Sequence, residues 1–151
     1  MIKIALLDPH PVVHKGFKAF FRKNDNISVV NTFSKTKDLY QFLNKISIDA
    51  LVIEMELAHD SVFKVIETVK AKHPDTSIVI YTSLPQTIYS ISLLKAGAAG
   101  YLSKEVNKKV IAEAIERVVE NGYYITSNFA NEINDNIYHK KSRNIYESLS
   151  P

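Results

Sequence analysis

The sequence contains no cysteine, which excludes disulfide bonds and thiolate chemistry. This composition is compatible with a reducing compartment, and we expect a cytoplasmic protein. Long apolar runs are also missing. The opening apolar stretch is interrupted by Lys3 and ends at Asp8, far short of a signal peptide's core, and no other run approaches the roughly 20 apolar residues of a membrane span. We therefore expect no membrane contact.

The sequence also has little excess charge of either sign, since 19 Lys and Arg residues face 16 Asp and Glu residues for a net charge of +3. This bias is too small to indicate nucleic-acid binding by itself. The densest basic run, residues 139–143, is more typical of a solvated linker than of a nucleic-acid contact. With 151 residues, 46% of them hydrophobic, the chain can build one domain with a sizeable core and a tail.

Short β-branched runs alternate with stretches in which apolar residues recur every three or four positions. This alternation predicts a parallel sheet with helices on both faces. The right-handed crossover rule and the flavodoxin-like precedent predict the strand order 2-1-3-4-5. The predicted fold class is therefore α/β, a flavodoxin-like doubly wound sheet of five strands with five helices. The predicted strands are residues 2–7, 27–33, 50–55, 77–82 and 99–103.

Helix boundaries are marked most clearly in the last predicted helix. Its apolar stripe falls within residues 110–119, Asn107 precedes it as an N-cap, and Gly122 follows its end. We expect one domain over residues 1–125. Residues 126–151 hold a short, weaker helical pattern and then a polar, basic linker, with too few apolar residues for a second domain. Other boundary signals are Pro11 in a first turn, Asp60 and Ser61 as N-caps, and Pro74 and Gly97 after helix ends.

Polar residues follow or end four of the predicted strands. Asp8 follows the first strand and precedes Pro9, Glu54 stands near the end of the third, Thr82 ends the fourth, and Lys104 follows the fifth. In an open α/β sheet the functional crevice lies beyond the carboxyl ends of the strands. We therefore expect two carboxylates, a hydroxyl and an ammonium group to converge on one cleft.

Two segments carry a resemblance to a known family. Residues 4–16, IALLDPHPVVHKG, are similar to its opening motif, and residues 94–104, LKAGAAGYLSK, are close to its fifth-strand signature. The chain thus resembles the receiver domain of bacterial response regulators of the NarL/FixJ type, over residues 2–136. This resemblance implies a CheY-like fold. Residues 146–151 look like the approach to a LuxR-type helix-turn-helix, so we expect a DNA-binding domain to follow.

The resemblance implies a phosphorylation site that this sequence has altered. The family accepts a phosphoryl group on an aspartate at the end of the third strand and uses a divalent metal held by an acidic pair after the first. Here Glu54 occupies the acceptor position. Of the acidic pair only Asp8 remains, because the position of the second acid is occupied by Pro9. The usual Pro-Gly of the next loop is Ala58-His59. Proline supplies no side-chain oxygen to a metal that demands near-ideal octahedral geometry, so we expect no magnesium binding or only weak binding.

Three further positions match the family's switch residues. Thr82 matches the hydroxyl that contacts the phosphoryl group, Tyr101 the aromatic switch residue, and Lys104 the cation that pairs with the acceptor. We expect Glu54 to pair permanently with Lys104 and partly to imitate a phosphorylated aspartate. The resulting hypothesis is a phosphorylation-independent pseudo-receiver, not an enzyme and without catalytic residues, that regulates an attached DNA-binding domain in transcription. A plain salt-bridge role for Glu54 is the alternative.

Partner expectations follow from the same resemblance. We expect a homodimer, formed through helix one with helix five or through helix four, strand five and helix five. DNA is contacted only through the attached domain, and a histidine-kinase partner stays open.

Three rival functions remain: a receiver that still accepts phosphate, with Glu54 as the candidate acceptor, a small-ligand domain that uses the vacated cleft, and a flavodoxin-like enzyme. The last is disfavoured because no phosphate-binding glycine loop follows the first strand. Asp8, His10 and His14 suggest a metal site, but the family carries the first histidine without using it as a ligand, and we expect none. Tyrosines in the strands, Tyr81 among them, are expected to be core or interface residues.

Overall fold

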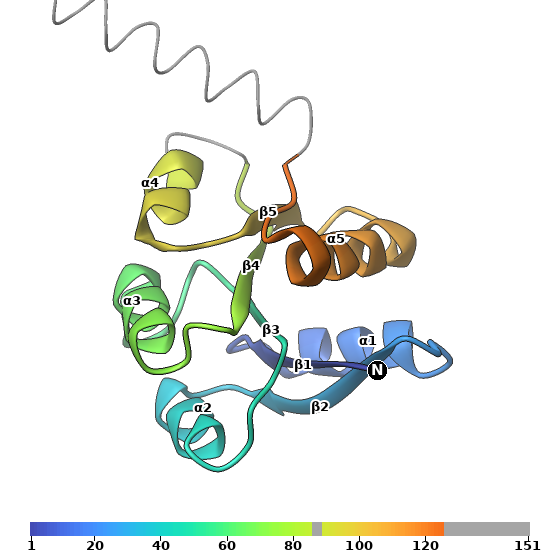
Figure 1. Ribbon diagram of the computed structural model, residues 1–151, viewed down its shortest axis with the longest axis horizontal. Coiled ribbons are helices and arrows are strands. Elements are labelled where there is room, and N and C mark those ends of the chain that lie inside the picture. The colour runs from blue at the N-terminus through green and yellow to red at the C-terminus, as the bar shows by residue number, and fades with distance from the viewer. Residues whose placement is uncertain (86–88, 126–151) are drawn as a thin grey trace, which may run out of the picture.

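A five-stranded sheet forms the centre of the computed structural model, which describes residues 1–85 and 89–125 (Figure 1). Strands and helices alternate along the chain. The strands are β1 (Ile2–Leu7), β2 (Ile27–Phe33), β3 (Ala50–Ile53), β4 (Ser77–Thr82) and β5 (Gly100–Ser103). The helices are α1 (Pro11–Phe21), α2 (Thr36–Leu43), α3 (Val62–Lys72), α4 (Tyr89–Ala96) and α5 (Lys108–Asn121).

The strand order is β2-β1-β3-β4-β5, and all four neighbouring pairs run parallel. Helices α1 and α5 cover one face of the sheet, and α2, α3 and α4 cover the other (Figure 1). The predicted fold class and strand order are therefore confirmed. No helix in the described part of the chain is long and apolar enough to cross a membrane.

Strand β1 shows why these strands read as continuous apolar runs. Ile4 and Leu6 belong to the core cluster under α1 and α5, whereas Ala5 and Leu7 belong to the cluster under α2, α3 and α4. All four side chains have 0% exposure. Alternate residues of a strand point to opposite faces, so a strand covered on both faces has no polar side. Burial of a Leu or Ile side chain contributes about 1.5–3 kcal/mol to folding.

Most predicted boundaries are confirmed. Pro11 is the first residue of α1, and Gly97 follows α4 with a φ of 124°. The Asn107 side chain caps α5 by accepting a hydrogen bond of 3.0 Å from the amide of Val110. Gly122 ends α5 in the left-handed conformation, with a φ of 89°. Glycine adopts that conformation without the steric cost of a Cβ atom.

Two strand boundaries and the predicted Asp60 cap are wrong, whereas Ser61 is the N-cap residue of α3 as predicted. Strand β3 ends at Ile53 rather than at residue 55, and β5 begins at Gly100 rather than at residue 99. Ser61 occupies the N-cap position of α3, but its side chain makes no capping hydrogen bond, and α3 starts after it rather than after Asp60. The backbone closes the first turn instead, through a hydrogen bond of 3.1 Å from the amide of Val65 to the Ser61 carbonyl. The predicted helix and linker of residues 126–151 lie outside the described residues and stay a prediction.

The contribution of the Asn107 cap to stability can be measured by substitution. Asn107→Ala is expected to lower the free energy of unfolding by about 1 kcal/mol, because the amide of Val110 loses its acceptor. Urea denaturation measures the change. Asn107→Ser is the matched control, since it keeps an oxygen at the cap position. Equal stability of the two variants would contradict the capping role.

Candidate functional site

The candidate site lies at the carboxyl ends of the central strands. Asp8 follows β1, Glu54 follows β3, and Lys104 follows β5. Asp8 is 0% exposed and Glu54 4% exposed, so both carboxylates are withdrawn from water. Buried charges are costly unless they are paired and hydrogen-bonded, so the partners of these groups determine whether the site is stable. We refer to Asp8, Glu54 and Lys104 as the carboxylate–lysine cluster.

Lys104 is the central group of the cluster. Its Nζ lies 2.7 Å from Oδ2 of Asp8 and 3.4 Å from Oε1 of Glu54. The expected Glu54–Lys104 ion pair is therefore present, and Lys104 makes a second, shorter contact to Asp8 that was not predicted. The Lys104 side chain is only 14% exposed, so the three charges interact with little screening by water.

The remaining carboxylate oxygens have partners close in sequence. Oδ1 of Asp8 accepts a hydrogen bond of 2.8 Å from the His10 amide and lies 3.0 Å from His10 Nδ1. Oε2 of Glu54 accepts one of 2.7 Å from the Met55 amide. His14 Nε2 lies 2.5 Å from the carbonyl oxygen of Asp8. Each oxygen of both carboxylates thus has a protein partner.

His10 is a site residue that the sequence reasoning missed. A signal was present, because an aspartate side chain commonly accepts a hydrogen bond from the amide two residues on, and Asp-Pro favours such turns. The position of Asp8 and Pro9 before His10 fits this turn. His14 contacts the backbone carbonyl of Asp8 rather than its carboxylate. No group of three or more His, Cys, Asp or Glu side chains suited to a metal ion occurs among the residues that the structure describes.

Thr82 and Tyr101 act on a different element, the loop after β4. Thr82 is 0% exposed, and its Oγ1 accepts a hydrogen bond of 3.3 Å from the Leu84 amide. The Tyr101 hydroxyl donates to the carbonyls of Leu84 at 3.2 Å and Pro85 at 3.4 Å, and its residue is 3% exposed. The two predicted switch residues therefore hold the same loop, with Tyr101 turned into the core.

Tyr81 connects the cluster to the core. Its residue is 4% exposed, so the expected core role is confirmed. The ring centroid lies 5.9 Å from Lys104 Nζ and 6.0 Å from the Phe17 ring. Burial raises the pKa of Tyr81 above 10.0, and the negative charge of Asp8 raises it further. An ammonium group over an aromatic face is favourable, so Tyr81 also supports the position of Lys104.

The residues present do not fit a magnesium ion. Pro9 offers no side-chain oxygen, and the cation closest to Asp8 and Glu54 is their own Lys104. Both oxygens of Asp8 already have hydrogen-bonding partners. Magnesium needs several oxygen ligands in octahedral geometry, and here a metal would have to displace existing partners from both acids. No step of function is therefore assigned to a metal.

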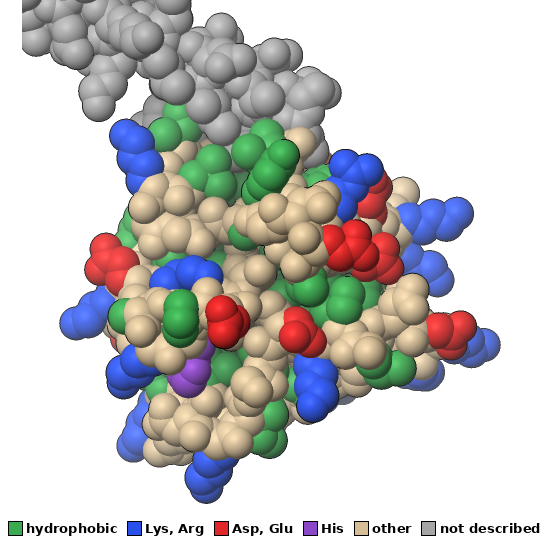
Figure 2. Space-filling model, viewed as in Figure 1, with side chains coloured by type: hydrophobic (Ala, Val, Ile, Leu, Met, Phe, Trp, Pro, Cys, Tyr) green, Lys and Arg blue, Asp and Glu red, His purple; other side chains and the backbone are tan. Residues whose placement is uncertain are grey.

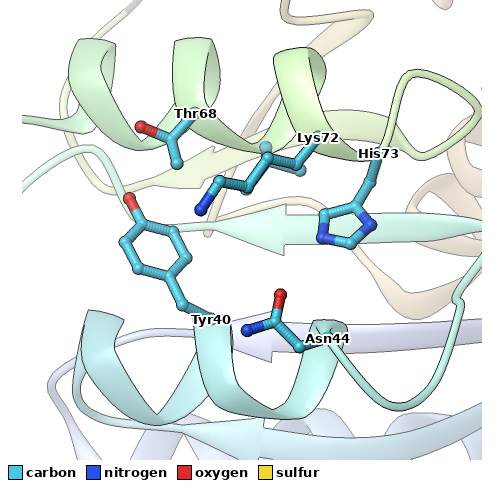
Figure 3. Close-up of a pocket in the computed structure, with 6 residues that line it drawn as sticks. Tyr40, Asn44, Thr68, Lys72 and His73 are labelled. Carbon is cyan, nitrogen blue, oxygen red and sulfur yellow. The ribbon is translucent and has the colours of Figure 1, made fainter.

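A separate pocket lies between the last turns of α2 and α3. Tyr40 and Asn44 face Thr68, Lys72 and His73 across it (Figure 3). The empty space between these side chains is about 190 Å³ when open solvent is included. Helices of this fold run back toward the amino ends of the strands, so this pocket lies away from the carboxylate–lysine cluster. It therefore gives no support to ligand binding in the vacated cleft.

The fold and the site together define a class of protein, a doubly wound α/β domain whose acidic and basic groups meet at the carboxyl ends of its strands. Comparison with known families identifies the class more closely. Residues 4–116 match the family model described as "Response regulator receiver domain". The chain belongs to the response regulator receiver domain family.

Curated relatives agree with this assignment. The chain is 24% identical over 132 residues to Fimbriae Z protein of Salmonella typhimurium, covering 87% of this chain and 63% of the relative. It is 25% identical over 151 residues to the response regulator UvrY of Escherichia coli, covering 99% and 69%. A nitrate/nitrite response regulator homologue of Haemophilus influenzae is matched over 62% of its length at 25% identity. The chain thus spans less than two thirds of the length of the first and third of these relatives.

Solved structures show the same fold. A LuxR-family two-component response regulator from Aurantimonas gives a TM-score of 0.80 at 21% identity, covering 90% of this chain and 97% of that one. The isolated receiver domain of RcsB from Salmonella enterica, determined with a phosphomimetic, gives 0.75 at 18% identity, covering 86% and 96%. At these identities the likeness establishes the fold alone.

Lys104→Met tests the carboxylate–lysine cluster. The variant is expected to lose about 3–5 kcal/mol of unfolding free energy, because Asp8 and Glu54 remain buried without their cation. Urea denaturation at neutral pH measures the loss. Lys109→Met, at an exposed position on α5, is the matched control, and a change within about 0.5 kcal/mol is expected there. In the double variant Glu54→Gln/Lys104→Met part of the loss should return, since one unpaired charge is gone. A Lys104→Met variant as stable as the control contradicts the account.

Tyr81 gives a pH-dependent prediction. Because its pKa is raised in the folded state, its contribution to stability is complete below the unfolded pKa and is lost as pH rises through the folded pKa. Unfolding free energy should therefore fall more steeply above about pH 10 in the wild type than in Tyr81→Phe. Tyr89→Phe, at a residue that is 49% exposed, should follow the wild-type curve. Parallel curves for Tyr81→Phe and the wild type would refute the role of burial.

Proposed function

We propose that this chain is a phosphorylation-independent receiver domain, which regulates an attached DNA-binding domain through protein contacts. One observation carries the proposal: Lys104 binds both Asp8 and Glu54, beside a proline where the family has a second acid. In the family this lysine pairs with an acceptor aspartate whose negative charge increases on phosphorylation. Here a fixed negative charge already engages it.

The carboxylate chemistry supports this reading. A phosphoryl group works by adding charge and acceptor oxygens that order nearby donors. Glu54 places a permanent carboxylate at the acceptor position, with one oxygen toward Lys104 and the other on the Met55 amide. Its oxygens also stand one methylene farther from the backbone than those of an aspartate, and a misplacement of about 1 Å costs on the order of a hundredfold in rate. Glu54 therefore holds the domain toward one state.

The rest of the chain and its partners complete the proposal. Residues 126–151 form a short helix and a basic linker that lead to a helix-turn-helix domain, and the receiver forms a homodimer in the cytoplasm. The names of similar proteins support the DNA-binding part of this proposal, since they include transcriptional regulatory proteins and an RcsB–DNA complex. DNA is contacted through that domain. On the face shown in Figure 2, basic side chains lie around the rim with acidic ones among them and form no continuous basic patch.

Intact-mass spectrometry after incubation with acetyl phosphate and magnesium tests the proposal. The wild-type chain should gain no phosphoryl mass, because its acceptor and metal ligands are altered. The matched control is the double variant Pro9→Asp/Glu54→Asp, which restores an acidic pair and an acceptor aspartate and should gain one phosphoryl group. Phosphorylation of the wild type would overturn the proposal. If neither protein is modified, Pro9 and Glu54 are not the cause of inertness, which also contradicts it.

A further inference from the structure

The outer edge of β5 is occupied by the chain that leaves α5. Residues 123–125, the exit segment, run beside β5 after the turn at Gly122 (Figure 1). Tyr124 forms a parallel bridge with Gly100, and its amide donates a hydrogen bond of 2.9 Å to the Ala99 carbonyl. Sheet edges offer unpaired backbone groups to any strand that can approach. The exit segment takes up this position on β5.

Gly100 makes this approach close. A Cβ atom at Gly100 would lie 3.3 Å from the Tyr124 carbonyl oxygen, 3.6 Å from Tyr124 Cβ and 3.6 Å from Cγ1 of Val118. The φ of Gly100 is not in the left-handed region, so space and not backbone conformation is what glycine supplies here. A methyl group would press on the Tyr124 carbonyl oxygen, which would have to shift by a few tenths of an ångström, while it would make ordinary van der Waals contact with Val118.

Neighbouring contacts fix the start of the exit segment. The Ser77 hydroxyl donates to the Val118 carbonyl at 3.2 Å, which ties the last turn of α5 to β4. Tyr124 is half-buried against the core cluster under α1 and α5. Tyr123 and Ile125 on either side are 60% and 38% exposed. This alternation is that of a strand with one covered face.

We propose that the β5 edge is the docking surface for the exit segment and that Gly100 is the residue that permits docking. The docked segment fixes the direction in which the chain leaves the receiver domain. The importance of that direction rests on the proposed function, because residues 126–151 lead to the regulated domain only if that proposal holds. The docking itself depends on the contacts of Gly100, Tyr124 and Val118.

Amide hydrogen exchange of the 151-residue chain, followed residue by residue by NMR, tests the docking. In the wild type the Tyr124 amide should exchange about tenfold more slowly than the Tyr123 amide, since only the former is bonded to the sheet. Gly100→Ala should raise the Tyr124 rate by about three- to tenfold relative to the Ile80 amide in the core. Gly16→Ala is the matched control, because a Cβ there meets nothing within 4 Å.

Equal rates for Tyr123 and Tyr124 in the wild type would overturn the proposal without any variant, even if Gly100→Ala fails to fold. An unchanged Tyr124 rate in a folded Gly100→Ala protein would overturn the role of Gly100. Acceleration in Gly16→Ala as large as in Gly100→Ala would show a general effect and would also overturn it. None of these results bears on the phosphorylation assay, so failure of the docking and failure of the proposed function are distinguishable.

Discussion

The arrangement of charged groups at the strand ends depends on one interaction, the contact of the Lys104 ammonium with two buried carboxylates. Two carboxylates withdrawn from water would repel each other and would each lack solvation. Lys104 lies between them, 2.7 Å from one and 3.4 Å from the other, while backbone amides take the remaining oxygens. One side chain thereby joins the ends of β1, β3 and β5, which are far apart in sequence.

Strand β5 connects the carboxylate–lysine cluster to two other parts of the molecule. It is four residues long, yet Lys104 follows it, Tyr101 within it holds the loop after β4, and Gly100 at its start receives Tyr124. Its backbone is tied to β4 through four paired positions. Because the strand is short and paired along its length, its ends cannot shift independently. The cluster, the loop and the exit segment therefore share one support.

The fold was predictable from the sequence because its signals are local or periodic. Doubly buried strands give continuous apolar runs, and caps such as Asn107 and Gly122 mark helix ends through their own chemistry. The three members of the carboxylate–lysine cluster were also predictable, since parallel strands bring their carboxyl ends together, whereas the role of His10 was not. Which of the two carboxylates makes the shorter contact with Lys104 was not predictable. Whether Lys104 lies nearer to Asp8 or to Glu54 depends on distances of less than an ångström, which residue types do not encode.

The substitutions at Pro9 and Glu54 are consistent with each other in electrostatic terms. With an acid at residue 9 and an acid at residue 54, the strand ends would hold three carboxylates against one ammonium, an arrangement that needs a divalent cation. Proline removes one of these charges, and the His10 amide and ring supply donors to Asp8. Two carboxylates then face the one ammonium of Lys104, so the excess negative charge falls from two to one, and the remaining oxygens have hydrogen-bonding partners from the protein itself. Reversing only one of the two substitutions would therefore not restore the metal-dependent arrangement, because the acceptor geometry and the ligand count are both required.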